Sequence, residues 1–201
     1  MSADVYVGDV AAAETAVRLP RGGTAVAVAA AASLVAATVH AAVVPEHLAH
    51  GWLHGAFLAA VAVAQVVLAW VVLRRPTVTA VILGLGGTTG VVLLYVASRT
   101  IGLPVAFGSA PESHSSHGGS ALVHQPIAGT IGPGVPVIPG LQGNPGVEAV
   151  GALDLVALAA ELGVLVALLA LLPQRQRTVV TNVLAVLGGT LWVGAMLLGN
   201  P

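Results

Sequence analysis

Five long apolar runs, separated by short polar segments, dominate the pattern of the sequence. They cover residues 22–44, 52–73, 77–98, 147–172 and 178–198. As an α-helix rising about 1.5 Å per residue, each run is long enough to cross a hydrocarbon core of about 30 Å. Pro45 is predicted to end the first run and Pro173 the fourth, because proline lacks the amide hydrogen that a continuing helix needs. The pattern predicts an all-α, polytopic transmembrane bundle of about five spans.

Composition strengthens this interpretation and narrows the chemistry. Hydrophobic residues make up 57% of the chain and charged residues 7%, so lipid must replace water over much of its surface. There is no cysteine, which excludes disulfides, thiolate metal ligands and thioether-linked haem. A net charge of −1 offers no basic surface, and nucleic acid is therefore not an expected partner. We expect the lipid bilayer as the first partner, and a thin Ala- and Gly-rich bundle leaves room for a membrane protein partner or a homo-oligomer.

The same pattern divides the chain into four segments. Residues 1–21 form an N-terminal segment, 22–103 hold spans one to three, 104–147 form a loop rich in His, Pro and Gly, and 148–201 hold spans four and five. A cleaved secretory signal is the alternative for the first run. Its apolar core would exceed the usual length of about 7 to 15 residues, and the acidic extension before it is atypical.

Arginine placement predicts the orientation. The arginines flanking spans alternate with segments 45–51 and 104–147, which contain no Lys or Arg. Because positive residues beside spans tend to stay in the cytoplasm, the N-terminus is predicted inside and the C-terminus outside, in a multi-pass plasma-membrane protein. The six arginines that carry this argument are Arg18, Arg21, Arg74, Arg75, Arg175 and Arg177.

The histidines gather on the predicted outer side. His40 is expected about one turn inside span one, His47 and His50 in the following link, and His54 at the start of span two. If the link continues helically into span two, spacings of three and four place the last three on one face, with Glu46 beside them. Imidazole and carboxylate ligands without sulfur suit Zn(II), Cu(II), Fe or Ni, and we expect Cu or Zn. An interfacial helix with amphipathic histidines, or a pH-linked role, are the alternatives.

Three more histidines lie in the long loop, among serines and glycines. They form a weaker metal-binding candidate, because their segment has no predicted secondary structure to fix their geometry. They are His114, His117 and His124.

Within the spans, ionisable side chains are costly and are expected to pair, to neutralise or to face the bundle interior. Asp154 and Glu161 are seven residues apart and share one face of span four. We predict an ion pair between Arg99 and Asp154 near the outer boundary. Glu161 lies deeper, without an evident basic partner, and is expected to be protonated or bonded to a polar group such as Gln65. A structural clamp and a proton relay are both open readings of this set.

Glycines supply a packing pattern. Gly86 and Gly90 form a GxxxG in span three, and Gly188, Gly189 and Gly194 lie in span five. Small residues at such spacing permit close helix approach, and we expect intramolecular packing at these positions.

Three segments of the sequence together resemble a known family. They are HAAVVPEHLAHGWLHGAFLAAVAVAQ (40–65), SRTIGLPV (98–105) and VGALDLVALAAEL (150–162). Read in order, they contain a His, then Pro-Glu-His, then a Gly and a Gln in the first segment. The second contains Arg-Thr-x-Gly-x-Pro, and the third an Asp and a Glu seven residues apart. This pattern is similar to that of an uncharacterised family of multi-pass membrane proteins of actinobacterial type. The resemblance covers spans one to four and implies the fold and the choice of residues, and it implies no reaction. The matching positions are His40, Pro45, Glu46, His47, Gly55, Gln65, Arg99, Thr100, Gly102, Pro104, Asp154 and Glu161.

Three function classes remain open. The first is a metal-binding membrane protein whose ligands are His40, Glu46, His47, His50 and His54. The second is a small proton-coupled transporter that uses Arg99, Asp154 and Glu161. The third is an accessory subunit in which His40 and His54 ligate one haem. No motif favours an enzyme, because the Gly-rich GLGGTTG (84–90) lies inside an apolar span, with no lysine and no preceding strand.

Overall fold

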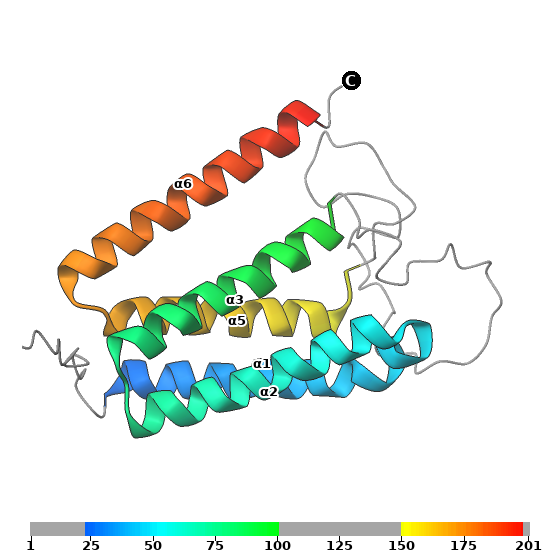
Figure 1. Cartoon of the computed structure of the whole chain (residues 1–201), viewed down its shortest axis with the longest axis horizontal. Coiled ribbons are helices and arrows are strands. Elements are labelled where there is room, and N and C mark those ends of the chain that lie inside the picture. Colours follow the sequence, from blue (N-terminus) through cyan, green and yellow to red (C-terminus); the bar gives the residue numbers. More distant parts are fainter. Residues whose placement is uncertain (1–22, 101–149, 199–201) are drawn as a thin grey trace, which may run out of the picture.

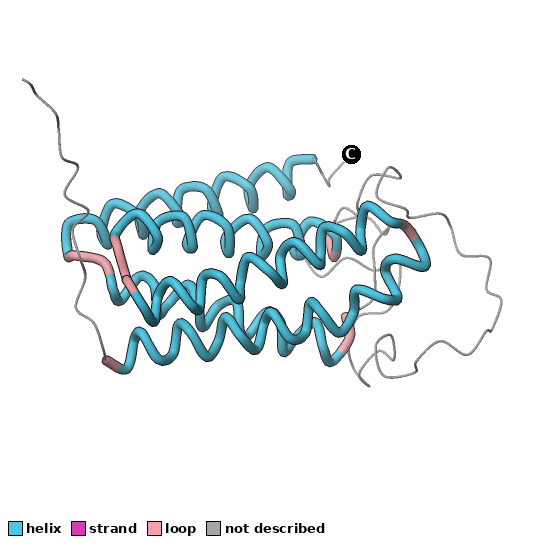
Figure 2. Tube along the Cα trace, turned by 60° about the horizontal axis from the view of Figure 1, so that its bottom comes forward, coloured by secondary structure: helices cyan, strands magenta, loops and turns pink. Residues whose placement is uncertain are grey.

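The computed structural model describes residues 23–100 and 150–198, which form an antiparallel helix bundle (Figure 1). All five helices are long and apolar enough to cross a membrane, and no strand occurs in these two ranges. The predicted fold class of five helical spans is confirmed. Figure 2 shows the described loops only at the two ends of the bundle. The helices are α1 (Thr24–His50), α2 (Trp52–Arg74), α3 (Val78–Ser98), α5 (Ala152–Leu171) and α6 (Gln174–Leu198).

The connection between α1 and α2 differs from the prediction in two ways. Pro45 does not end the first span, since α1 continues through it to His50. Proline costs the helix one hydrogen bond and a steric contact, and here the packing of α1 against α2 and α5 holds the helix together across it. The link also does not continue helically into span two. Gly51 caps the end of α1, and its backbone N–H donates a hydrogen bond to His47 O at 2.9 Å. Helix α2 starts at Trp52 and runs in the opposite direction.

Helices α1, α2, α3 and α5 pack around a small apolar core. Much of it is built from alanine and valine, which lets the backbones of α1 and its neighbours approach closely. Ser33 is fully buried, and its hydroxyl donates to Gln65 O at 2.9 Å, a bond that joins α1 to α2. The buried members of the main core cluster are Val26, Ala29, Val72, Val81, Leu85, Val164, Ala167, Leu168 and Leu172.

The glycines that pack between helices are not the ones the GxxxG pattern predicts. A Cβ added at Gly86, Gly90 or Gly188 would meet nothing within 4 Å, so the prediction that these glycines pack against another helix of the bundle is wrong. Close contacts occur instead at Gly55, against Leu48, and at Gly84, against Leu68 and Leu168, with Gly163 lying near Ala32. Spacing alone misses this result, because a GxxxG stripe says nothing about which way it faces. The other two predicted positions, Gly189 and Gly194, have equally open surroundings.

Helix α6 stands apart from the other four. None of its most apolar 18-residue window is buried, whereas the other spans bury between 22% and 33% of theirs. Figure 1 shows α6 diverging from α5 along its length. Its start is fixed by Arg177, whose guanidinium donates to Ala170 O at 3.0 Å and Leu172 O at 3.2 Å and so satisfies carbonyls at the end of α5. The apolar surface of α6 is of the kind that lipid covers.

The two ends of the bundle differ in charge. One end, called the arginine end, carries Arg74 and Arg75 at the end of α2 and Arg175 and Arg177 at the start of α6. The opposite end, called the histidine end, carries the α1–α2 turn, the last residues of α3 and the start of α5 (Figure 1). This segregation agrees with the charge pattern in the sequence. Which end faces the cytoplasm stays a prediction.

Candidate functional site

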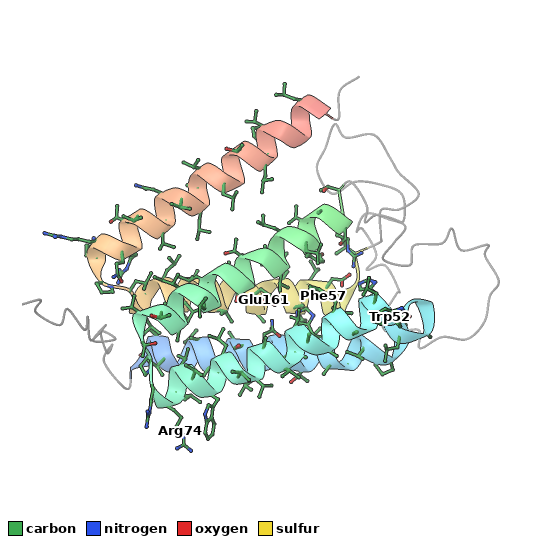
Figure 3. The ribbon with its side chains drawn as sticks, viewed as in Figure 1. Trp52, Phe57, Arg74 and Glu161 are labelled. Atoms are coloured by element: carbon green, nitrogen blue, oxygen red, sulfur yellow. The ribbon has the colours of Figure 1, made fainter. Side chains whose placement is uncertain are left out.

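A buried carboxyl lies between α1, α2 and α5. Glu161 on α5 is only 2% exposed and sits near the middle of the bundle (Figure 3). The Nε2 atom of His40 on α1 lies 3.1 Å from Glu161 Oε1. The side-chain amide of Gln65 on α2 donates to the same oxygen. Three helices therefore converge on one carboxylate oxygen, and a charged group at this depth is partnered as the low dielectric requires. We call His40, Gln65 and Glu161 the core cluster.

Two oxygens of the core cluster lack a donor. Glu161 Oε2 and Gln65 Oε1 are both buried, and neither has a hydrogen-bond partner among the described residues. Both are acceptors when the carboxyl is ionised, whereas a carboxylic acid O–H is a donor. A proton on Glu161 Oε2 would therefore turn one of these two buried acceptors into a donor. Buried polar atoms almost always have a hydrogen-bond partner, so two that have none call for a physical explanation.

The predictions for Glu161 are half right. Its bond to Gln65 is confirmed, and the absence of a basic partner is wrong, because His40 reaches it. The error follows from the length of α1. Since α1 runs on to His50, His40 lies ten residues before its end, about 15 Å at the helical rise, and far deeper than one turn.

A second pair joins α3 to α5 at the histidine end. Arg99 Nη2 donates to Asp154 Oδ2 at 3.0 Å, which confirms the predicted ion pair. The same Asp154 oxygen accepts from the Gly151 amide at 2.8 Å and so caps the start of α5. The Arg99 guanidinium also lies 5.3 Å from the centre of the Tyr95 ring. Arg99 is 8% exposed, so the pair joins the end of α3 to the start of α5 in a largely buried position.

The histidines of the α1–α2 turn meet across it. The rings of His47 and His54 are 4.4 Å apart between centroids and stand edge to face. His47 Nδ1 lies 2.8 Å from Val43 O. A carbonyl oxygen can only accept, so Nδ1 carries the hydrogen and Nε2 is left as the atom that can bind a ligand.

The rest of the predicted metal set does not join these two rings. Within 23–100 and 150–198, no three His, Asp or Glu side chains are gathered so that they could hold a metal ion. His40 is two turns from His47 on α1 and faces Glu161. Glu46 is half-buried on α1, and His50 is the last residue of that helix, with its side chain outside the described residues. The loop candidates His114, His117 and His124 also lie outside the described residues.

Sequence reasoning missed Ser33 altogether and gave His40 a different role. The signal available for such contacts is the depth of polar residues along antiparallel spans, because residues before and after the Gly51 turn lie side by side at similar distances from it. Ser33 lies eighteen residues before that turn and Gln65 fourteen after it. Polar residues at similar depth in three spans are the signal for such a cluster.

No protein-family model, no curated protein and no solved structure matches this chain. The resemblance to an actinobacterial-type membrane family therefore stays a prediction, and the site rests on its own geometry.

Proposed function

We propose that this integral membrane protein is a small proton-coupled carrier, in which the core cluster binds and releases the proton. The observation that carries the proposal is the buried Glu161 carboxyl, which shares one oxygen with His40 and Gln65 and leaves the other unpartnered. Buried ionisable groups inside a membrane bundle are a hallmark of ion pathways and proton relays.

The charge balance of the pair supports a proton as the bound ion. With one proton between them, His40 and Glu161 carry no net charge, either as imidazolium and carboxylate or as imidazole and carboxylic acid. A second proton, or the loss of the first, would leave a net charge at 2% exposure, which is costly in a low-dielectric core. Proton binding and release at this pair must therefore be linked to a rearrangement that admits water or a solute, which is what coupling requires.

Substitution at Glu161 separates this role from a structural clamp. Glu161→Gln keeps an oxygen that accepts from His40 and Gln65 but cannot titrate, whereas Glu161→Asp keeps a titratable carboxyl. We expect pH-dependent proton uptake, followed with a trapped pH-sensitive dye in proteoliposomes, to be lost in Glu161→Gln and partly kept in Glu161→Asp. The infrared band of a protonated carboxyl should disappear in the Gln variant as well.

A clamp predicts a different pattern. In that case Glu161→Gln would behave like the wild type in both assays, and Glu161→Asp, with its shorter reach, would be the damaged variant. Wild-type proteoliposomes that take up protons no faster than empty vesicles would also contradict the proposal.

A metal site at the α1–α2 turn is the second candidate. It is favoured by the contact between the His47 and His54 rings, and by the hydrogen bond of His47 Nδ1 to Val43 O, which leaves Nε2 as the nitrogen that can bind a metal. We expect Cu or Zn to copurify with the protein in detergent and to be lost in His47→Ala. Metal content at the level of the buffer, or unchanged in His47→Ala, would remove this candidate. Haem ligation would require His40 Nε2 to exchange Glu161 for iron, and an absorption spectrum with a Soret band is its test.

A further inference from the structure

Among the described residues, the arginine end of the bundle carries positive charge and no carboxylate. Arg74 ends α2, Arg75 follows it, and Arg175 lies at the start of α6, all three exposed. The carboxylates in the described part of the chain are Glu46, Asp154 and Glu161, which lie at the histidine end or in the middle of the bundle. Within the same part of the chain, neither Arg74 nor Arg75 forms an ion pair with any of these carboxylates, so both guanidinium groups are available to an anion at this end of the bundle.

Beside these arginines is an open hollow of about 660 Å³, between the end of α2 and the start of α3. The Arg74 guanidinium lies 4.2 Å from the centre of the Trp70 ring, a cation–π contact that holds it on one wall. Figure 3 shows Arg74 projecting from the end of α2 away from the bundle. The hollow is lined by Trp70, Val71, Leu73, Arg74, Arg75 and Thr77.

The tryptophans of α2 indicate where this hollow lies relative to the membrane surface. Trp52 is 73% exposed and Trp70 is 58% exposed, at opposite ends of the helix. Eighteen residues separate them, which is about 27 Å along the axis and close to the thickness of a hydrocarbon core. Exposed tryptophans at both ends of a span mark the two membrane interfaces. Trp70 and the arginines after it therefore lie at the level of lipid headgroups.

We propose that this hollow binds the phosphodiester headgroup of an anionic phospholipid. Arg74 and Arg75 supply the charge and the N–H donors that a phosphate oxygen accepts, and Trp70 supplies an interfacial ring. The positive end of the α3 dipole, at Val78, adds to the same field. Exposed Leu73 continues the wall of the hollow onto the lipid-facing surface, which suits a headgroup with acyl chains attached better than a free phosphate.

Quenching of Trp70 fluorescence tests the proposal. In a Trp52→Phe/Trp192→Phe background Trp70 is the single tryptophan, and brominated phosphatidylglycerol and brominated phosphatidylcholine are compared as quenchers in phosphatidylcholine vesicles. A basic residue near a membrane contributes about a fivefold preference for anionic lipid. We expect phosphatidylglycerol to be preferred by at least that factor, and Arg74→Gln/Arg75→Gln to bring the ratio to about one.

Arg175→Gln is the control for each single variant, Arg74→Gln and Arg75→Gln, because each of the three removes one positive charge from the same end and only Arg175 lies outside the hollow. It should leave the preference within about twofold of wild type. Equal loss in Arg175→Gln and in each single variant would overturn the proposal in favour of a general surface charge. Equal quenching by both lipids would overturn it directly, and so would displacement of the brominated lipid by inorganic phosphate, which would show a site for the free anion.

Discussion

The two halves of the bundle use the same helices for different purposes. Towards the arginine end, α1, α2, α3 and α5 meet in an apolar cluster in which Val72, Val81 and Leu168 are fully buried. From the middle towards the histidine end, the same four helices bring together Glu161 and its partners, and then the pair of Arg99 and Asp154. One half is held by close packing, and the other by a few directed polar contacts.

This difference implies that stability and chemistry are separable in this protein. In lipid, helices associate through close packing and interhelical hydrogen bonds, because there is no water to expel. The apolar cluster provides the packing, and none of its members is ionisable. The polar half provides hydrogen bonds but leaves Glu161 Oε2 and Gln65 Oε1 unpartnered, which a purely structural contact would avoid. Substitutions in the two halves should therefore fail in different ways.

The largest loss of stability is expected in the apolar half. Leu168→Ala removes a side chain with 0% exposure and leaves a cavity, which should cost about 2 to 5 kcal/mol in the free energy of unfolding. Leu187→Ala on α6, where the side chain is 42% exposed, is the matched control and should cost far less. Thermal or denaturant unfolding in detergent, followed by circular dichroism, compares the two. Equal losses would mean that the apolar cluster is not what holds the bundle.

An intermediate loss is expected at the histidine end. Asp154→Asn keeps the shape but leaves the Arg99 guanidinium without its counter-charge at 8% exposure. Because the Asp154 side chain is 29% exposed, we expect about 1 to 3 kcal/mol, less than for a fully buried pair. The same unfolding assay measures it, with the exposed Arg175→Gln as a control for loss of one charge. A cost as small as the control's would show that Arg99 is stabilised by other contacts.

A smaller loss is expected where α1 and α2 turn. A Cβ at Gly55 would come within 2.8 Å of the Leu48 backbone nitrogen, so Gly55→Ala must shift the turn and should cost about 1 to 2 kcal/mol. Gly188→Ala on α6 meets nothing within 4 Å and should be neutral or slightly stabilising, as alanine favours a helix over glycine. If both variants unfold alike, the turn is more adaptable than its geometry indicates.

The smallest change in stability is expected at Glu161. Glu161→Gln retains the side-chain oxygen that accepts from His40 and Gln65, and should alter the free energy of unfolding by less than about 1 kcal/mol. Together with a loss of proton uptake, that outcome would make the separation of the two halves complete. A variant that unfolds as readily as Leu168→Ala would instead make the core cluster a structural element.

Hydropathy and charge were enough to predict the helices and two of the polar contacts. Spans could be counted because each needs about 20 apolar residues. Arg99 and Asp154 could be paired because hydropathy predicts both at the same end of two spans that are consecutive in the sequence. Gln65 was proposed for Glu161 as a polar group within a neighbouring apolar run, and the bond is present.

The contact of His40 with Glu161 was not predicted, because a first span that ends at Pro45 places His40 too close to the membrane surface to reach Glu161. It depends on the length of α1 beyond Pro45 and on the rotation of α1 about its axis, and neither is encoded in hydropathy. The packing predicted at Gly86 and Gly188 failed for a related reason, because it also depends on how each helix is rotated about its axis. A periodic pattern gives the face on which residues lie but not the neighbour to which that face turns.

The spacing of Trp52 and Trp70 also bears on the bilayer thickness that this bundle would match. A girdle spacing of about 27 Å is slightly shorter than an average hydrocarbon core of about 30 Å. In a thick, sterol-rich bilayer the chain would have to draw the two leaflets together locally, whereas lipids with shorter acyl chains would match it without strain. Hydrophobic mismatch therefore predicts that the bundle unfolds less readily in vesicles of shorter acyl chains than in vesicles of longer ones.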